Sequence, residues 1–194
     1  MGYMVRNNLI NETPQLYTIS SMDKPRLIVG LGNPGQEYAN NRHNIGFMAL
    51  DAVAEAQDIS FVTKKDLRAL VAVTHIEGKQ VVLAKPITFM NLSGEAVQSL
   101  ASFYKVSTAD ITVVHDELDL PFGKVQKKIG GGSAGHNGLK SIIQHLGEDF
   151  TRIRVGIGPK TPEQMDTADY VLQDFSKAEQ KKLAGIIKEA ISIT

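Results

Sequence analysis

The chain of 194 residues contains no cysteine. This absence excludes disulfide bonds, thiolate nucleophiles, cysteine-ligated zinc and iron–sulfur clusters, and it favours a reducing compartment such as the cytoplasm. Long apolar runs are also missing, since none approaches the roughly 20 residues of a membrane-spanning helix. Net charge is zero, because 21 Lys and Arg balance 21 Asp and Glu. We therefore expect a cytoplasmic protein without a membrane partner, and the total charge identifies no other partner.

The length is typical of a single globular domain. Residues 1–22 lack helical or strand periodicity and the apolar segment of a secretion signal. We interpret them as a flexible N-terminal extension, an upstream start or a cloning remnant. Residues 23–194 are predicted to form one α/β domain, because no composition shift or internal repeat marks a second one.

Regular patterns begin near Lys24 and alternate between strands and helices. The predicted strands are 26–29, 69–76, 79–84, 111–114, 124–129 and 153–157. The predicted helices are 44–57, 92–104, 137–146 and a last helix near the C-terminus. Asn91 or Ser93 is the candidate cap of the helix at 92–104, and the capping box Ser176–Glu179 begins the last helix. Glu77-Gly78 predicts a hairpin turn. This order predicts an α/β fold, with a mixed twisted sheet flanked by helices in α/β/α layers.

Charge is unevenly distributed along the chain. Residues 106–120 contain four acids and no Lys or Arg, whereas residues 121–160 contain seven bases and two acids. A basic segment of this kind can bind a polyanion locally. Charge alone favours a solvated face without a partner and leaves binding of a polyanion open as the second interpretation.

A glycine motif, Gly30-x-Gly32-x-x-Gly35, follows the first strand and partly matches a dinucleotide-binding fingerprint. The acidic residue that should end a second strand about 20 residues later lies inside a predicted helix instead. The later glycine-rich segment 130–135 lacks the Lys and Ser or Thr of a phosphate-binding loop. The motif therefore argues only weakly for a nucleotide cofactor.

The segment His115-Asp116-Glu117-Leu118-Asp119 directly follows the strand predicted at 111–114. Ligands collect at the carboxyl ends of strands in open α/β sheets, so its position favours function. Three interpretations stay open: a turn whose acids cap backbone amides, a catalytic carboxylate, or a metal site. The metal site is disfavoured because consecutive strand residues point in alternating directions.

His43 and His136 each lie beside an asparagine among glycine and polar residues, whereas His75 and His145 fit structural positions. An imidazole is the natural general base at neutral pH once a carboxylate orients it. Four asparagines stand at predicted element ends, where they could cap helices or turns. Together with His43, His136 and Asp116 they predict a polar cleft that binds peptide-like groups. These asparagines are Asn33, Asn44, Asn91 and Asn137.

Six segments, read in order, resemble the bacterial-type peptidyl-tRNA hydrolase family. They are LIVGLGNPG (27–35), YANNRHNIG (38–46), KPITFMNLSG (85–94), HDELDLP (115–121), GGGSAGHNGL (130–139) and RIRVGIG (152–158). The resemblance runs from about Leu27 to the end of the chain. It implies a monomeric α/β enzyme, without a metal, cofactor or obligate protein partner, that cleaves the ester between a peptide and the 3′ ribose of tRNA.

The resemblance also implies roles for individual residues. His43 would be the catalytic base, Asp116 the carboxylate that orients it, and Asn137 would hold the attacking water. Asn33 and Asn91 would position the peptide and the tRNA terminus. The remaining expected binding residues are Tyr38 beside the tRNA end, Met90 and His136 along the peptide cleft, and Lys128 and Arg154 on the face that binds the acceptor stem. Gln126 stands where a second basic residue is usual, which leaves open which of Lys124, Lys127 and Lys128 meets phosphate.

Two other classes of protein remain as rivals at this point. A nucleotide-cofactor enzyme would bind a dinucleotide at 30–35. A non-catalytic RNA-binding protein would bind tRNA and leave peptidyl-tRNA intact.

Overall fold

The computed structural model describes residues 24–76, 78–160 and 162–194. The predicted extension at 1–22 and Glu77 of the predicted hairpin turn lie outside the described residues. The strands are β1 (Arg26–Gly30), β2 (Val62–Lys64), β3 (Ala69–Ile76), β4 (Lys79–Pro86), β5 (Ile111–Pro121), β6 (Val125–Ile129) and β7 (Thr151–Gly158). The α-helices are α1 (Ile45–Ala56), α2 (Ser93–Tyr104), α3 (Asn137–Leu146), α4 (Thr167–Val171) and α5 (Lys177–Ser192). Short 3-10 helices are η1 (Gln36–Tyr38), η2 (Arg42–Asn44), η3 (Lys65–Leu67), η4 (Met90–Leu92) and η5 (Thr108–Asp110).

All seven of these strands form one sheet in the order β2-β3-β4-β1-β5-β7-β6. The centre is parallel, since β1 pairs with β4 and β5, and β5 pairs with β7. Both edges are antiparallel, through β2–β3–β4 on one side and β6–β7 on the other. The predicted mixed sheet and the predicted pairing of 69–76 with 79–84 are confirmed.

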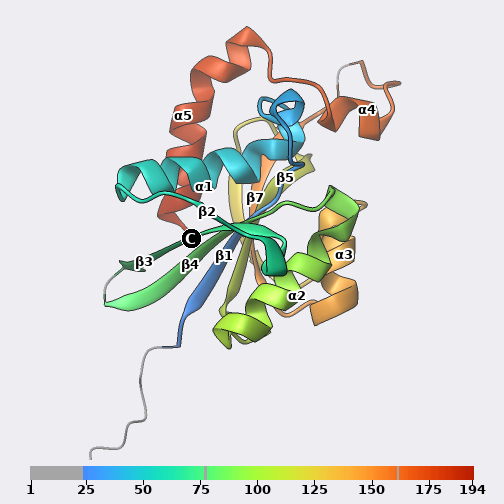
Figure 1. Ribbon diagram of the computed structural model, residues 1–194. Helices are drawn as coiled ribbons and strands as arrows, with labels where there is room; N and C mark the ends of the chain where they lie inside the picture. The colour runs from blue at the N-terminus through green and yellow to red at the C-terminus, as the bar shows by residue number, and fades with distance from the viewer. Residues whose placement is uncertain (1–23, 77, 161) are drawn as a thin grey trace, which may run out of the picture.

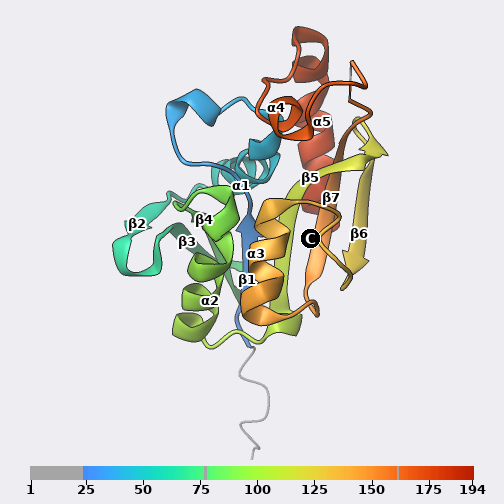
Figure 2. The same ribbon diagram turned by 90° about the vertical axis from the view of Figure 1, so that its right-hand side faces the viewer.

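Helices cover both faces of the sheet, as the predicted α/β/α layers require. Helices α2 and α3 lie side by side over one face (Figure 2), and α1 and α5 cover the other (Figure 1). Among the described residues, three apolar clusters fill the space between the layers, one around Leu100, Ile142 and Phe150, a second around Ile45 and Ile157, and a third around Leu50 and Leu83. Each such fully buried side chain contributes about 1.5–3 kcal/mol to stability.

One strand differs from its prediction in a way that matters for the site. Strand β5 continues to Pro121, so the acidic segment 115–119 lies within the strand and the turn interpretation is wrong. The neighbouring strand β7 supplies backbone partners for it, in pairs such as Asp116 with Val155 and Glu117 with Gly156. Pairing with a neighbour thus overrides the low strand propensity of acidic residues.

Helix caps were predicted with mixed success. The capping box of α5 is confirmed, because Ser176 Oγ accepts from Glu179 N and Glu179 Oε2 accepts from Ser176 N. The predicted caps of α2, Asn91 or Ser93, are wrong, since Leu92 stands at the N-cap position without a side-chain cap and Ser93 Oγ donates to the carbonyl of Met90 instead. Among the described residues, no helix is long and apolar enough to cross a membrane.

Candidate active site

Two glycines bring the turn that carries His43 against the end of β1. A Cβ at Gly30 would collide with the carbonyl oxygen of Gly46, and a Cβ at Gly46 would collide with the backbones of Leu31 and Val114. This close approach needs residues without side chains. Gly30 of the predicted dinucleotide motif therefore serves helix–strand packing, and it places η2 beside the carboxyl ends of β1 and β5.

Arg42, which sequence reasoning did not single out, anchors the same turn from the other side. Its guanidinium donates to the carbonyl oxygen of Asp174 at 2.9 Å and to Glu179 Oε2 at 3.0 Å, and it lies 4.5 Å from the centre of the Tyr170 ring. The side chain is buried, and its charge is neutralised by the carboxylate that also completes the α5 capping box. Adjacent to His43 in sequence, it fixes the backbone that presents the imidazole.

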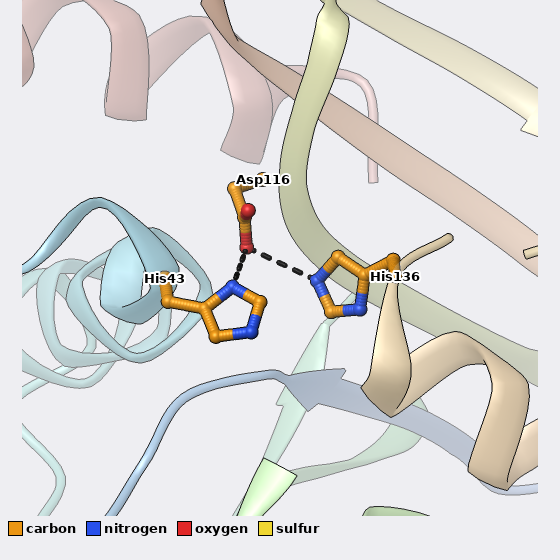
Figure 3. A group of neighbouring side chains, drawn as sticks. All are labelled: His43, Asp116 and His136. Atoms are coloured by element: carbon orange, nitrogen blue, oxygen red, sulfur yellow. Dashed lines mark hydrogen bonds and ion pairs between the residues drawn. The ribbon is translucent and has the colours of Figure 1, made fainter. Parts of the chain in front are cut away.

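His43, Asp116 and His136 come from three distant segments and meet at one carboxylate oxygen (Figure 3). Asp116 Oδ1 accepts from His43 Nδ1 at 2.8 Å and from His136 Nε2 at 3.0 Å. A carboxylate only accepts, so both ring nitrogens carry the proton. The other nitrogen of His136, Nδ1, accepts from the backbone N–H groups of Gly138 and Leu139, which fixes its tautomer. In the neutral ring of His43 the nitrogen without a proton is therefore Nε2.

Burial and charge oppose each other in the pKa values of this group. Burial lowers the pKa of His43, but the charge of Asp116 and the hydrogen bond to it together raise it above 6.5. Burial raises the pKa of Asp116, yet the charges of both histidines and their hydrogen bonds hold it well below its usual value. Asp116 is therefore an anion that stabilises positive charge on the imidazole of His43.

A third imidazole, His115, lies beside His136 with the two rings edge to face and 5.1 Å between centroids. Burial, followed by the charge of His136, lowers the pKa of His115 to about 3, so it stays neutral. Its Nδ1 donates to the backbone carbonyl of Asp116 at 2.7 Å. His115 thus helps to fix the strand at the position of the carboxylate.

The predicted metal ligands of segment 115–119 do not converge. Asp116 faces the two histidines, Glu117 pairs with Arg154, and Asp119 is exposed. Within the residues described, His43, Asp116 and His136 offer ligand atoms within 4.8 Å of one another and could hold an ion. His43 Nδ1 and His136 Nε2 both point at Asp116 Oδ1 and not at a common point beside it. An ion bound by these three atoms would therefore have to displace two protons and move the carboxylate. This geometry is that of a hydrogen-bonded network.

A cavity of about 400 Å³ opens at this network. Its lining residues are His43, Asp116, Glu117, Leu118, Ala134, Gly135, His136, Asn137, Thr167, Ala168 and Val171. The cavity therefore joins the ends of η2 and β5 to the start of α3 and to α4. A smaller cavity of about 160 Å³, lined mainly by apolar residues of the sheet, α1 and α5, contains none of the predicted site residues.

The predicted asparagines occupy different environments. Asn137 is exposed at the start of α3 and lines the larger cavity. Asn33 is buried, and its Oδ1 accepts from the backbone N–H of Met90 at 2.9 Å. Asn91 is exposed in η4. The cavity lining therefore includes Asn137 but not Asn33, whose backbone is hydrogen-bonded to the side chain of Asn44.

Two of the predicted binding residues, Met90 and Tyr38, are not among the residues that line the cavity. Met90 lies against the start of α3, because a Cβ at Gly138 would come within 2.5 Å of Met90 Sδ and 3.1 Å of the His136 ring. Tyr38 is half-buried in η1. Met90 is thus a neighbour of His136.

The predicted basic face lies on β6 and β7, at one edge of the sheet. Lys128 is exposed, whereas Arg154 donates to Glu117 Oε2 at 2.9 Å and to Gln126 Oε1 at 2.5 Å. Arg152, which we did not single out for a role, is buried and donates to the carbonyls of Gly131 and Gly132. Arg152 therefore holds the glycine-rich loop before His136. Because Arg152 and Arg154 are engaged within the protein, only part of the positive charge of residues 121–160 is available to a partner.

An anionic carboxylate that orients a buried imidazole beside a cavity is an arrangement found in the active sites of enzymes. On this α/β fold it defines the class of protein as an enzyme, and no serine or cysteine stands among the residues that line the cavity. The sequence and structure comparisons agree with this class.

Residues 27–194 match the family model described as peptidyl-tRNA hydrolase. The peptidyl-tRNA hydrolase of Frankia alni is 50% identical over 169 residues, which cover 87% of this chain and 85% of the relative. That of Exiguobacterium sibiricum is 46% identical, with 87% and 90% covered. The crystal structure of the Acinetobacter baumannii peptidyl-tRNA hydrolase superposes with a TM-score of 0.81 at 40% identity, covering 89% of this chain and 88% of that one. The chain belongs to the peptidyl-tRNA hydrolase family.

Proposed function

We propose that this protein hydrolyses the ester that joins a peptide to the 3′ ribose of tRNA, and so releases the peptide and recycles the tRNA of interrupted translation. The observation that carries the proposal is the 2.8 Å hydrogen bond from His43 Nδ1 to Asp116 Oδ1 at the edge of the cavity. Family membership supports the choice of substrate.

In the proposed reaction, His43 Nε2 removes a proton from a water molecule, and the water oxygen bonds to the ester carbonyl carbon. The bond from that carbon to the 3′ oxygen of the ribose then breaks. The imidazolium returns its proton to the leaving oxygen, so the products are a peptide carboxylic acid and tRNA with a free 3′ hydroxyl. Asp116 stabilises the imidazolium and, in the neutral ring, holds the proton on Nδ1 so that Nε2 is the basic nitrogen.

The asparagines contribute position rather than protons. Asn137 lines the cavity beside His136, so its amide can hold the attacking water. Asn33 and Asn91 would position the peptide main chain and the tRNA terminus, which supplies the proximity part of the rate. Tyr38 would lie by the tRNA end, and Met90, beside His136, would line the peptide cleft.

His136 fits a role closer to the reaction than the peptide contact expected for it. Its Nε2–H donates to the same oxygen as His43, so it holds the carboxylate in place from the opposite side. Backbone donors on its Nδ1 keep it from becoming an alternative base. We propose that His136 orients Asp116 while it lines the cleft.

The acceptor stem would bind through its phosphates to the basic face of β6 and β7, chiefly at Lys128. Such contacts give affinity without sequence recognition and depend strongly on salt. The proposal includes action as a cytoplasmic monomer, without a metal, cofactor or obligate protein partner. Every proton transfer in the scheme is assigned to His43, which is why no metal is invoked.

The test is incubation of the protein with N-blocked aminoacyl-tRNA in the presence of a chelator, followed by measurement of free tRNA. We expect hydrolysis that is lost in His43→Ala. Binding of the tRNA without hydrolysis would identify a non-catalytic RNA-binding protein, and hydrolysis that stops with chelator would contradict the metal-free mechanism. A thermal shift with a dinucleotide at the segment 30–35 would favour the nucleotide-cofactor rival.

A further inference from the structure

Asn44 stands directly after His43 and directly before α1, at the position where an asparagine usually caps its own helix. Its side chain makes no such cap. Instead the side-chain amide is turned toward the loop after β1, and the residue is only 2% exposed. A buried amide that is not used by its own helix must have another partner.

That partner is the backbone of Asn33, and the Asn44 side chain bonds to both its N–H and its carbonyl. Asn44 Oδ1 accepts from the N–H of Asn33 at 2.9 Å, and Asn44 Nδ2 donates to the carbonyl oxygen of Asn33 at 3.0 Å. One side chain thereby fixes the peptide units on either side of Asn33. It also ties the turn of His43 to the turn of Asn33, eleven residues apart in the chain.

The side chain of Asn33 is fixed as well, and in one orientation. Its Oδ1 accepts from the backbone N–H of Met90 at 2.9 Å, and a backbone N–H can only donate. The amide of Asn33 therefore cannot flip without losing this bond. Within the described part of the chain no group accepts from Asn33 Nδ2, so two N–H donors are left for a ligand.

We propose that Asn44 is a positioning residue, which holds Asn33 so that only the donor side of its amide faces the substrate. This inference rests on the proposed function and deepens it. The group that Asn33 binds must then be an acceptor, such as a carbonyl oxygen of the peptide ester or a ribose oxygen. An N–H group of the substrate would meet no acceptor there.

Asn44 acts through Asn33 and not through the base, because its side chain makes no hydrogen bond to His43 or Asp116 among the described residues. Its loss leaves the N–H and carbonyl of Asn33 without partners and lets the loop move. Misplacement of a positioning group by about 1 Å can cost roughly 100-fold in rate. We expect Asn44→Ala to lower kcat/KM for N-blocked aminoacyl-tRNA about 10- to 100-fold, without moving the acid limb of its pH profile.

A double-mutant cycle with Asn33→Ala, Asn44→Ala and the double variant tests this inference. If Asn44 acts through Asn33, the double variant loses no more kcat/KM than Asn33→Ala alone. Losses that multiply would overturn the inference, as would an unchanged kcat/KM in Asn44→Ala or a shifted acid limb. Should Asn44→Ala not fold, the cycle is run with the isosteric Asn44→Asp, which keeps the acceptor for the Asn33 N–H and sets an oxygen against its carbonyl.

Ser141→Ala is the matched control. Ser141 is buried, and its Oγ accepts from the backbone N–H of Gly94 at 2.9 Å between α2 and α3, so the variant loses a comparable bond away from Asn33. We expect it to keep kcat/KM even if its thermal stability falls as much as that of Asn44→Ala. Wild-type protein that leaves the ester intact would overturn the proposed function itself, whereas active wild type with multiplying losses overturns only the role of Asn44.

Discussion

The cavity end of the sheet and the basic edge at β6 and β7 use charge in opposite ways. At the cavity, Asp116 is 4% exposed and both of its hydrogen-bond donors are buried or nearly so. At the basic edge, Lys128 is exposed and has room to move. Buried charge is costly unless it is fully hydrogen-bonded, so it is held in one geometry, whereas exposed charge is screened and adaptable.

The difference between buried and exposed charge separates residues that are expected to set the rate of the reaction from residues that are expected to set the affinity for the substrate. A fixed, buried network can lower the barrier of a chemical step because it needs no rearrangement when charge develops. Exposed lysines can follow the phosphates of a flexible polyanion but hold no single atom in place. We therefore expect substitutions at the cavity to change kcat, and substitutions at the basic edge to change KM and its salt dependence.

The largest effect is expected from His43→Ala. General base catalysis contributes about 10²–10⁴ to a rate, so kcat for N-blocked aminoacyl-tRNA should fall by that factor. Stability should fall by about 1–3 kcal/mol, because Asp116 keeps only one of its two donors. Single-turnover hydrolysis and urea unfolding measure the two effects. The exposed His75→Ala is the control, and full activity in His43→Ala would remove the proposed base.

Asp116→Asn should come next, with a distinctive change in pH dependence. The base works only when neutral, so kcat/KM falls as pH drops through the pKa of His43, which lies above 6.5 in the native protein. Without the carboxylate, burial dominates and lowers this pKa, so the acid limb should move to lower pH while kcat falls about 10²-fold or more. The pH profile of kcat/KM measures both. Asp119→Asn, an exposed acid on the same strand, should change neither, and an unmoved limb in Asp116→Asn would contradict the pairing.

His136→Ala should have a smaller effect on rate and the opposite effect on pH. The variant removes one donor from Asp116 Oδ1, which leaves more of the carboxylate charge for His43. The pKa of His43 should then rise further, so the acid limb moves to higher pH. Kcat should fall about tenfold, because the carboxylate is less firmly oriented. A limb that moves in the same direction as that of Asp116→Asn would show that His136 does not compete for this oxygen.

The sequence predicted some of the helices and strands near these two regions correctly and others wrongly. Periodicity was enough for the helix at 137–146, which the structure gives as Asn137–Leu146, and for the hairpin of β3 and β4. The end of β5 was predicted wrongly, because acids favour turns locally and only pairing with β7 keeps them extended. Local patterns lose force where a distant strand decides the conformation.

The candidate site shows the same limit. His43, Asp116 and His136 were singled out by residue type and neighbours, but a shared carboxylate oxygen between segments so far apart in the chain could not be inferred from spacing. Arg42 and Arg152 were missed as site residues because a buried arginine that bonds to backbone carbonyls leaves no sequence pattern. Asn44 was noted as a possible cap and as one of four asparagines expected at a polar cleft, but its partner lies on another loop and could not be inferred from its position.

The smallest effect on chemistry, and the sharpest test of the basic edge, is expected from Lys128→Glu. The variant should raise KM for tRNA substrates, leave kcat nearly unchanged, and reduce the slope of log KM against log salt by about one. Arg154→Gln should change KM less, because Glu117 and Gln126 already engage its guanidinium. Lys64→Glu, on β2 at the opposite edge of the sheet, is the matched charge reversal. Equal shifts in KM for Lys128→Glu and Lys64→Glu would mean that the tRNA responds to total charge alone, and the basic edge would then have no special part in binding.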